Sequence, residues 1–389
     1  MNDKAKEMLG EVQALLQCSN QNWLFGAGIS FDSNIPLMFP LTERIEALIN
    51  NGDYSDVYFA IKKQLNKHSH IEHFLSQIGD IITLIGRTNK KELSINDQLY
   101  AINDLNSLYQ EIIYHIGNTV RYGYKKDGKT ETGTVGSITN PIVEIANHRK
   151  FVKALIGICK ERTANINFFT TNYDTLLEDA LVIEHEEIRD GFIGTAMGYW
   201  NPEEAFKRNL NKRNIHNVYK LHGSIDWYHD QDNSLIRCRY GTKYLSDNHN
   251  LLIYPQATKY VETQKDPFAF LFAQFRESFE QSKDNILVAN GYSFGDNHIN
   301  NEIENAIKKP CNKTNLIIFV KEDSNDNQYG LNETLKRWIE DETINERIFI
   351  LTDRSIYNGN MKEDNSDKYN WWTFTGMIDD IMLGGAEIE

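Results

Sequence analysis

The stretch Asn22-Trp23-Leu24-Phe25-Gly26-Ala27-Gly28-Ile29-Ser30 decides the fold class. Its first residues form a short, largely apolar run that predicts a strand, and a glycine-rich turn follows at once. Strand, glycine turn and helix in this order are what a phosphate-cradling Rossmann-type unit requires. Glycine permits a close backbone approach, and N–H groups at the next helix start would face a pyrophosphate. A tight turn without a ligand is the equally open alternative for this block alone.

The alternation of strand and helix returns in the second half of the chain. We expect strands at Ile166–Thr170, Val218–Leu221, Leu251–Tyr254, Ile286–Ala289 and Leu316–Val320, and helices at Phe151–Glu161, Thr175–Leu181, Pro267–Glu280 and Asn297–Ile307. This order predicts an α/β protein with a Rossmann-like, mainly parallel sheet flanked by helices. Ligands of such sheets bind at the carboxyl ends of the strands.

The region between these two parts follows a helical pattern. We expect helices at Thr42–Asn50, Tyr54–Leu65, Ile71–Ile85 and Ile95–Ile116, and a flexible loop or small hairpin at 117–140. The sequence therefore predicts a Rossmann-like domain from 1–40 and 151–325, an inserted helical lobe at 41–150, and a C-terminal extension at 326–389. The extension, with Trp371, Trp372 and Phe374, is expected to pack on the core or at an oligomer interface.

Composition bounds the class of protein. The chain has 389 residues, of which 40% are hydrophobic and 25% charged, and its formal net charge is −14. This charge disfavours a surface that wraps duplex DNA, because phosphate binding depends on clustered Lys and Arg. The N-terminus is charged and amphipathic, and no apolar run approaches the roughly 20 residues that span a bilayer. We therefore expect a cytoplasmic protein.

Cysteine usage gives no sign of a metal site. The four cysteines are Cys18, Cys159, Cys238 and Cys311, and none forms a C-x-x-C pair that would supply half of a tetrahedral zinc site. We expect buried, reduced thiols, no zinc module and no bound metal.

Three further blocks follow predicted strands: Thr170-Thr171-Asn172-Tyr173-Asp174, Lys220-Leu221-His222-Gly223-Ser224 and Gly291-Tyr292-Ser293-Phe294-Gly295-Asp296. Asn172 and Asp174 alternate across Tyr173, so both polar side chains are expected to point one way and Tyr173 the other. A turn-forming Asn and a helix-capping Asp are the alternative. His222 has the chemistry of a general base near neutral pH, although a lone loop histidine is commonly structural.

In order and spacing, the four blocks resemble the NAD-binding core of the sirtuin family. Thr171 stands where that family has Gln, and Tyr173 where it has Ile. The resemblance implies that Asn172 positions the ribose or attacking water, Asp174 binds the nicotinamide carboxamide and His222 is the general base. It also implies contacts with NAD from Gly26, Ala27, Gly28, Ser30, Ile35, Thr171, Gly291 and Ser293.

The chain also departs from the sirtuin pattern. Asn34 replaces the glycine before Ile35-Pro36, and Leu37-Met38-Phe39 replaces the Asp-Phe-Arg of deacylating members. The zinc-binding cysteine pairs expected after His222 are missing, which removes support for a cleft that clamps an acyl-lysine peptide. The pattern is more similar to sirtuin-like proteins of bacterial antiphage defence, which hydrolyse NAD and include partners of HerA-like hexameric ATPases.

We therefore expect an NAD glycohydrolase that releases nicotinamide and ADP-ribose and acts as a regulated defence effector. Two alternatives remain open: an NAD-dependent protein deacylase, and a non-catalytic NAD- or ADP-ribose-binding subunit of a DNA-processing ATPase complex. We expect a homo-oligomer and no membrane partner. A HerA-like ATPase is the expected class of partner, and DNA is expected to act through such a partner rather than by direct binding.

Overall fold

The computed structural model of the chain describes residues 3–17, 20–88, 90–126, 133–158, 166–207, 215–229, 232, 234–239, 251–253, 266–280, 285–325, 328–364 and 369–384. The helices there are α1 (Asp3–Leu15), η1 (Ala27–Ser33), α2 (Met38–Ile49), α3 (Ser55–Lys62), α4 (Ile71–Gly86), α5 (Ile102–Tyr122), α6 (Ala146–Ile158), α7 (Leu176–Ile183), α8 (Pro202–Ala205), α10 (Phe268–Glu277), α11 (Asn297–Ile307), α12 (Glu333–Glu340), η3 (Asn345–Arg347), α13 (Phe374–Gly376) and η4 (Met377–Met382).

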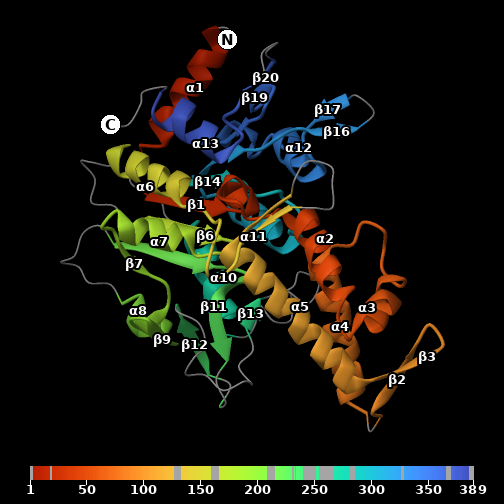
Figure 1. The fold of residues 1–389 in the computed structure, drawn as a ribbon. Helices are drawn as coiled ribbons and strands as arrows, with labels where there is room; N and C mark the ends of the chain where they lie inside the picture. The colour runs from red at the N-terminus through yellow and green to blue at the C-terminus, as the bar shows by residue number, and fades with distance from the viewer. Residues whose placement is uncertain are drawn as a thin grey trace.

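The strands fall into two larger sheets and three hairpins (Figure 1). The main sheet comprises β1 (Asn20–Phe25), β6 (Asn167–Thr170), β7 (Glu187–Arg189), β10 (Ile215–Lys220), β14 (Asn285–Asn290), β15 (Asn315–Phe319), β18 (Ile348–Leu351), β19 (Ser355–Asn358) and β20 (Met361–Asp364). The second comprises β8 (Phe192–Gly194), β9 (Met197–Trp200), β11 (Gly223–His229), β12 (Leu235–Cys238) and β13 (Leu251–Ile253). The hairpins are β2 (Glu92–Ile95) with β3 (Gln98–Ala101), β4 (Tyr124–Lys126) with β5 (Gly133–Val135), and β16 (Asp323–Asn325) with β17 (Gln328–Gly330).

The main sheet confirms the predicted α/β, Rossmann-like class. Its strand order is β20-β19-β18-β15-β14-β1-β6-β10-β7, and pairing is parallel from β18 to β7. Only β19 and β20, at one edge, pair antiparallel. The chain leaves β1 for β6 on one side and returns to β14 on the other, so the order reverses between β1 and β14. Ligands of open α/β sheets bind outside the strand ends at such a reversal.

Helices cover both faces of the main sheet because its central strands are apolar on both sides. Trp23, Phe25 and Val288 belong to a core with α1, α6, α7 and α13. Leu24 and Leu287 face the opposite way, into a core with α10, α11 and α12. A strand buried on both faces reads as a continuous apolar run, which is why Trp23-Leu24-Phe25 predicted a strand without alternation.

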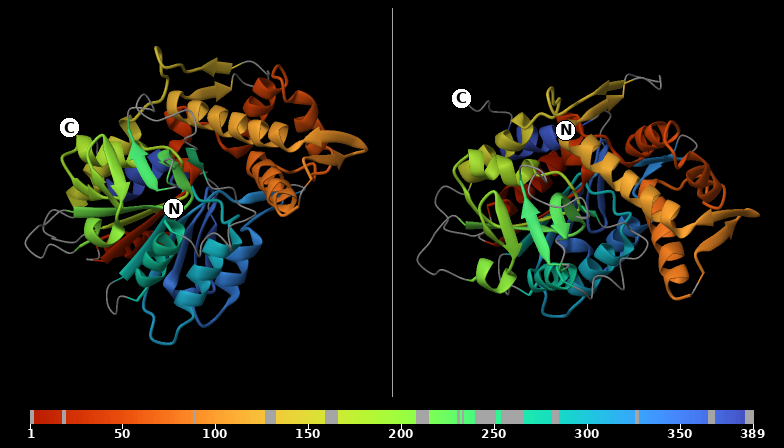
Figure 2. Two further views of the ribbon diagram at one scale, coloured as in Figure 1. Left: turned by 90° about the horizontal axis from the view of Figure 1, so that it is seen from below. Right: turned by 60° about the horizontal axis from the view of Figure 1, so that its bottom comes forward.

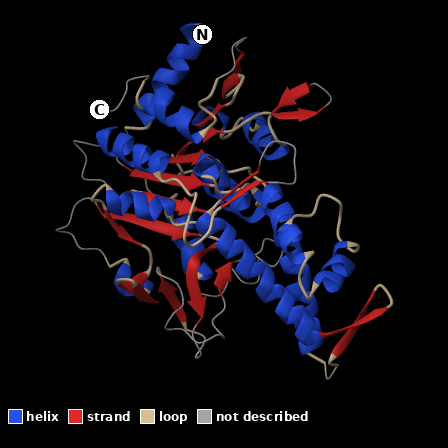
Figure 3. Ribbon diagram, viewed as in Figure 1, coloured by secondary structure: helices blue, strands red, loops and turns tan. Residues whose placement is uncertain are grey.

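Helices α2 to α5 form a separate apolar cluster, which we call the helical cluster. It lies to one side of the sheet, at the right in Figures 1 and 2, and contains buried residues such as Ile45, Tyr58, Phe74 and Leu108. The predicted helix Ile95–Ile116 was wrong at its start. Asn96 and Asp97 have φ of 51° and 66°, which a two-residue hairpin turn requires, so β2 and β3 precede α5. Figure 3 shows this hairpin as strands.

The C-terminal segment completes the main sheet. Strand β18 pairs with β15, and β19 and β20 extend the same edge. Trp371 and Phe374 are buried in the core beneath β1. Of the cysteines, Cys238 is buried and Cys311 is exposed, while Cys18 and Cys159 lie outside the described residues. In the described part of the chain, every helix is too short or too polar to cross a membrane.

Candidate functional site

The four sequence blocks follow four neighbouring strands, β14, β1, β6 and β10, at their carboxyl ends. Backbone hydrogen bonds continue past the strand ends and join the loops. The Gly26 N–H donates to Asn290 O at 3.2 Å, the Thr171 N–H to Phe25 O at 3.0 Å, and the Leu221 N–H to Thr170 O at 2.8 Å. The blocks therefore meet at one edge of the sheet, as the sequence predicted.

The glycines of the first and last blocks pack directly against each other. A Cβ at Gly26 would lie 2.5 Å from Gly291 O, and one at Gly28 would lie 2.6 Å from Gly291 Cα. The Gly28 N–H donates to Gly291 O at 3.0 Å. Gly291 itself has φ +67°, which favours glycine. These glycines are thus required for contact between the loops, whereas Ala27 and Ser293 are exposed to solvent.

Ser30, Asn172 and Asp174 form a buried hydrogen-bond network, which we call the Ser30 network. The Ser30 hydroxyl donates to Asp174 Oδ2 at 2.8 Å and accepts from Asn172 Nδ2 at 3.1 Å. The other oxygen, Asp174 Oδ1, accepts from the Leu176 N–H at the start of α7, at 3.1 Å. Asn172 is 7% exposed, and its Oδ1 has no hydrogen-bond partner among the described residues. The network thus holds a buried acceptor whose hydrogen-bonding capacity the described residues leave unmet.

His222 lies in the turn between β10 and β11 and is 3% exposed. Its Nε2 is 3.8 Å from Asp296 Oδ2, across the loop that opens α11. Asp296 occupies the N-cap position but makes no side-chain capping hydrogen bond. Its carboxylate is therefore better described as a partner of His222 than as a cap of α11. Gly223 follows with φ +84° and turns the chain into β11.

The His222 and Asn172 loops are also joined beyond the histidine. Tyr173 O accepts from the Ile225 N–H at 3.0 Å and from Ser224 Oγ at 3.2 Å. With the Leu221 bond to Thr170, these contacts hold the His222 turn against the Asn172 loop on both sides. Sequence reasoning gave neither these contacts nor the Asp296 partner, since each joins residues far apart in the chain.

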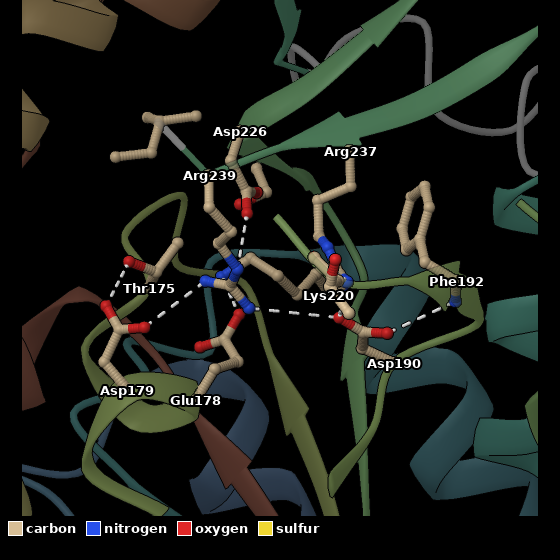
Figure 4. A network of polar contacts seen from close by, with 12 residues as sticks. Thr175, Glu178, Asp179, Asp190, Phe192, Lys220, Asp226, Arg237 and Arg239 are labelled. Atoms are coloured by element: carbon tan, nitrogen blue, oxygen red, sulfur yellow. Dashed lines mark hydrogen bonds and ion pairs between the residues drawn. The ribbon is translucent and has the colours of Figure 1, made fainter. Parts of the chain in front are cut away.

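A cavity of about 860 Å³ opens beside the Ser30 network. Of the predicted site residues, Ile35 and Asp174 line it, whereas His222, Asn172 and the glycines do not. Its wall also carries Asp179, Asp190, Asp226, Arg237 and Arg239 (Figure 4). The cavity thus meets the predicted site at its nicotinamide end only.

Two arginines of the cavity wall, Arg237 and Arg239, are paired with carboxylates of the same wall. Arg237 Nη1 contacts Asp190 Oδ2, and Arg239 Nε lies 3.3 Å from Asp226 Oδ2 (Figure 4). Burial works against the charged form of Arg239, but the carboxylates around it, Asp226 foremost, outweigh burial and raise its pKa. Such mutual pairing is what buried charges need for stability.

Two buried side chains behind the wall also form an ion pair. Lys220 Nζ lies 3.1 Å from Glu178 Oε1 and also donates to Asp174 O. Burial raises the pKa of Glu178, although the nearby Lys220 works in the opposite direction. Lys220 thereby ties the end of β10 to the backbone of Asp174.

One further polar residue at this edge was not predicted. Asn290 ends β14 directly after its apolar run Ile286–Ala289 and is 0% exposed. Neither atom of its side-chain amide has a hydrogen-bond partner in the described structure. The sequence signal was present, because a buried apolar run that ends in Asn before a glycine is unusual for packing alone.

The comparisons agree with this geometry. Residues 166–345 match the family model of the SIR2-like domain. A search of curated proteins found no match. The fold defines a Rossmann-like α/β class, and the match supports a sirtuin-like family with an NAD-related function. The matched range contains three of the four blocks. The fourth, Gly26–Ser30, lies outside it but follows β1, which pairs in parallel with β6 and β14 and so lies beside the other blocks.

In the ranges that the structure describes, His, Cys, Asp and Glu side chains do not gather in a group of three or more that would hold a metal ion.

Proposed function

We propose that this protein is an NAD glycohydrolase that cleaves NAD to nicotinamide and ADP-ribose. The observation that carries the proposal is the Ser30 network, in which the buried Asn172 Oδ1 has no hydrogen-bond partner among the described residues. A buried amide oxygen costs free energy unless it is bonded, so a polar ligand group at this place would stabilise the site. A ribose hydroxyl has the required donor.

The predicted contacts fit an extended dinucleotide. Ile35 and Asp174 both line the cavity, so they can hold the nicotinamide end. Gly26 and Gly28 have their N–H groups bonded to the Asn290–Gly291 turn. Their part in phosphate binding is therefore to keep side chains away from the backbone. The exposed Ala27 and Ser293, with Thr171 and Gly291, provide the surface on which the phosphates and riboses would lie.

The residues can supply what cleavage of a ribosyl–pyridinium bond needs. The nicotinamide of NAD leaves as a neutral molecule, so no general acid is required. Asn172 is fixed by Ser30 and would orient the ribose or the attacking water. His222 would accept the proton of that water or of a ribose hydroxyl. The nearby Asp296 carboxylate would stabilise the imidazolium that results.

We further propose that the activity serves antiphage defence through NAD depletion in the cytoplasm. Uncontrolled hydrolysis of NAD would be toxic, so assembly as a homo-oligomer or with a HerA-like ATPase would hold it in check. Two features of the sequence support NAD hydrolysis over protein deacylation. It has no C-x-x-C pairs, and its blocks depart from the pattern of deacylating sirtuins. Full activity of a dilute, isolated monomer would contradict control by assembly.

The test is product analysis. Purified protein is incubated with NAD, alone and with a candidate ATPase or DNA, and nicotinamide and ADP-ribose are quantified by liquid chromatography. We expect equal amounts of both, and a loss of about 10²–10⁴-fold in His222→Ala. His115→Ala is the matched control, since His115 pairs with Glu111 on α5.

Other outcomes would overturn the proposal. NAD binding without nicotinamide release under every condition would favour a non-catalytic binding subunit. Release of an acyl group from a peptide in step with nicotinamide would favour a deacylase.

A further inference from the structure

Tyr173 stands between two proposed site residues, Asn172 and Asp174, but its side chain belongs to the helical cluster. It is 8% exposed and packs with the apolar residues of α2 to α5. Its hydroxyl donates to Glu72 Oε1 at 2.6 Å. Glu72 lies in the first turn of α4 and is 3% exposed. The helical cluster therefore places a buried carboxylate directly on the loop that carries Asn172.

The backbone of Tyr173 is bonded to the His222 loop at the same time. Its carbonyl oxygen accepts from Ser224 Oγ at 3.2 Å and from the Ile225 N–H at 3.0 Å. One residue thus contacts the helical cluster through its hydroxyl and the strand after His222 through its carbonyl. A shift of Tyr173 would move Asn172, Asp174 and the His222 turn together.

A second contact between the helical cluster and this strand is independent of Tyr173. Arg121, near the end of α5, donates through Nη2 to Ile225 O at 2.5 Å and to Tyr228 Oη at 3.2 Å. Two helices of the cluster therefore contact the proposed site: α4 bonds to the loop that carries Asn172, and α5 bonds to strand β11, which follows His222.

The Tyr173 hydroxyl stays protonated and can therefore donate its hydrogen bond to Glu72. Burial, with a further contribution from the negative charge of Glu72, raises the pKa of Tyr173 well above its ordinary value of 10. The phenol therefore keeps its proton throughout the neutral range and donates to Glu72 continuously.

We propose that Glu72 is a positioning residue, which acts through Tyr173 to hold Asn172 and Asp174 in the geometry needed for cleavage. Its role in turnover rests on the proposed NAD cleavage, whereas its role in loop order does not. The helical cluster is then part of the site's architecture, and a change in the cluster alters turnover without touching the substrate.

The first test measures kcat, which a loss of positioning should lower and a loss of stability alone should not. We expect Tyr173→Phe and Glu72→Leu to lower kcat for nicotinamide release about tenfold, since each removes the buried hydrogen bond between Tyr173 and Glu72. Glu72→Gln keeps an oxygen acceptor for the phenol and should stay within about twofold of wild type. Thr42→Val is the matched control. It removes the bond from the Ile71 N–H to Thr42 Oγ1, 2.9 Å, in the same cluster, and should lower stability but not kcat.

The second test does not depend on NAD cleavage. The Asn172 N–H donates to Thr170 Oγ1 and the Leu176 N–H to Asp174 Oδ1, so amide hydrogen exchange of this loop reports its order directly. We expect faster exchange in Tyr173→Phe and Glu72→Leu, but not in Glu72→Gln or Thr42→Val. Unchanged exchange in both disruptive variants would overturn the inference. A wild type that releases no nicotinamide would overturn the proposed function alone.

Discussion

In the Ser30 network a serine hydroxyl bridges an amide and a carboxylate, whereas in the neighbouring cavity guanidinium groups face carboxylates directly. The network leaves one buried acceptor, Asn172 Oδ1, without a partner among the described residues. The principal charges of the cavity wall find opposite charges within the wall itself. The size and charge of a cavity therefore do not identify the reactive site on their own. Paired charges serve the stability of the fold, whereas the unmet acceptor Asn172 Oδ1 is the group that our proposal assigns to the substrate.

The largest expected effect falls on the network. Asn172→Ala should lower kcat for nicotinamide release about 10²–10³-fold, as loss of a preorganised polar group does in other enzymes. Initial rates at saturating NAD measure it. The control is Asn167→Ala. Asn167 lies at the amino end of β6, the strand that precedes Asn172, and its side chain donates to Asn22 Oδ1 at 2.8 Å. An equal loss in both variants would mean that Asn172 acts only through the fold.

The next effect concerns the cavity wall. Arg237→Met should leave Asp190 short of its closest cation and lower the free energy of unfolding by about 3–5 kcal/mol. We expect kcat of the folded variant to stay unchanged. Urea denaturation and turnover are measured together. Arg276→Met removes an exposed pair with Glu302 and should cost about 1 kcal/mol or less. A fall in kcat for Arg237→Met would mean that the charged wall of the cavity, and not only its end at Ile35 and Asp174, takes part in cleavage, which would break the comparison.

A third effect concerns pH near the network. His148, on α6, lies 3.4 Å from Ser33 Oγ. Burial lowers its pKa to about 4, although the charge of Asp174 works in the opposite direction. Between about pH 6.5 and about pH 4, the His148 imidazole is protonated in the unfolded chain but stays neutral in the folded chain. The free energy of unfolding should therefore fall with pH, by on the order of 3 kcal/mol in total.

The measurement is urea denaturation at about pH 7 and about pH 4.5. Most of the expected loss of stability from His148 falls between these two pH values. His148→Gln removes the titrating group, so its stability should fall less over the same interval. If the variant and the wild type lose the same stability, His148 is not buried in its neutral form.

The smallest effect concerns the glycine contact. Gly28→Ala would place a Cβ 2.6 Å from Gly291 Cα, and such overpacking costs about 1–3 kcal/mol. We also expect a higher KM for NAD, because the two loops must separate. Thermal unfolding and KM are measured. Gly10→Ala, in α1 with open space around it, should instead stabilise by about 0.5–1 kcal/mol. No difference between the two variants would argue against close packing of the loops.

Local patterns in the sequence were sufficient for most of the sheet. The apolar run before Gly26 and the runs before Thr171, Leu221 and Gly291 all became strands of the main sheet. The second sheet was not predicted beyond one strand near Leu251. Its strands are short, and the turns between them give a weaker sequence signal for a strand end than the glycine-rich blocks do.

The positions of the four polar or glycine-rich blocks at strand ends could be predicted from the amino-acid sequence, because strand length and turn chemistry are local properties of the chain. The partners of those blocks depend on how the elements pack in three dimensions. Ser30 meets Asn172 across 142 positions, and Tyr173 meets Glu72 across 101. The pairing of His222 with Asp296 likewise depends on the sheet placing β10 and β14 on either side of β1 and β6. Such contacts follow from the packing of whole elements, which no local pattern encodes.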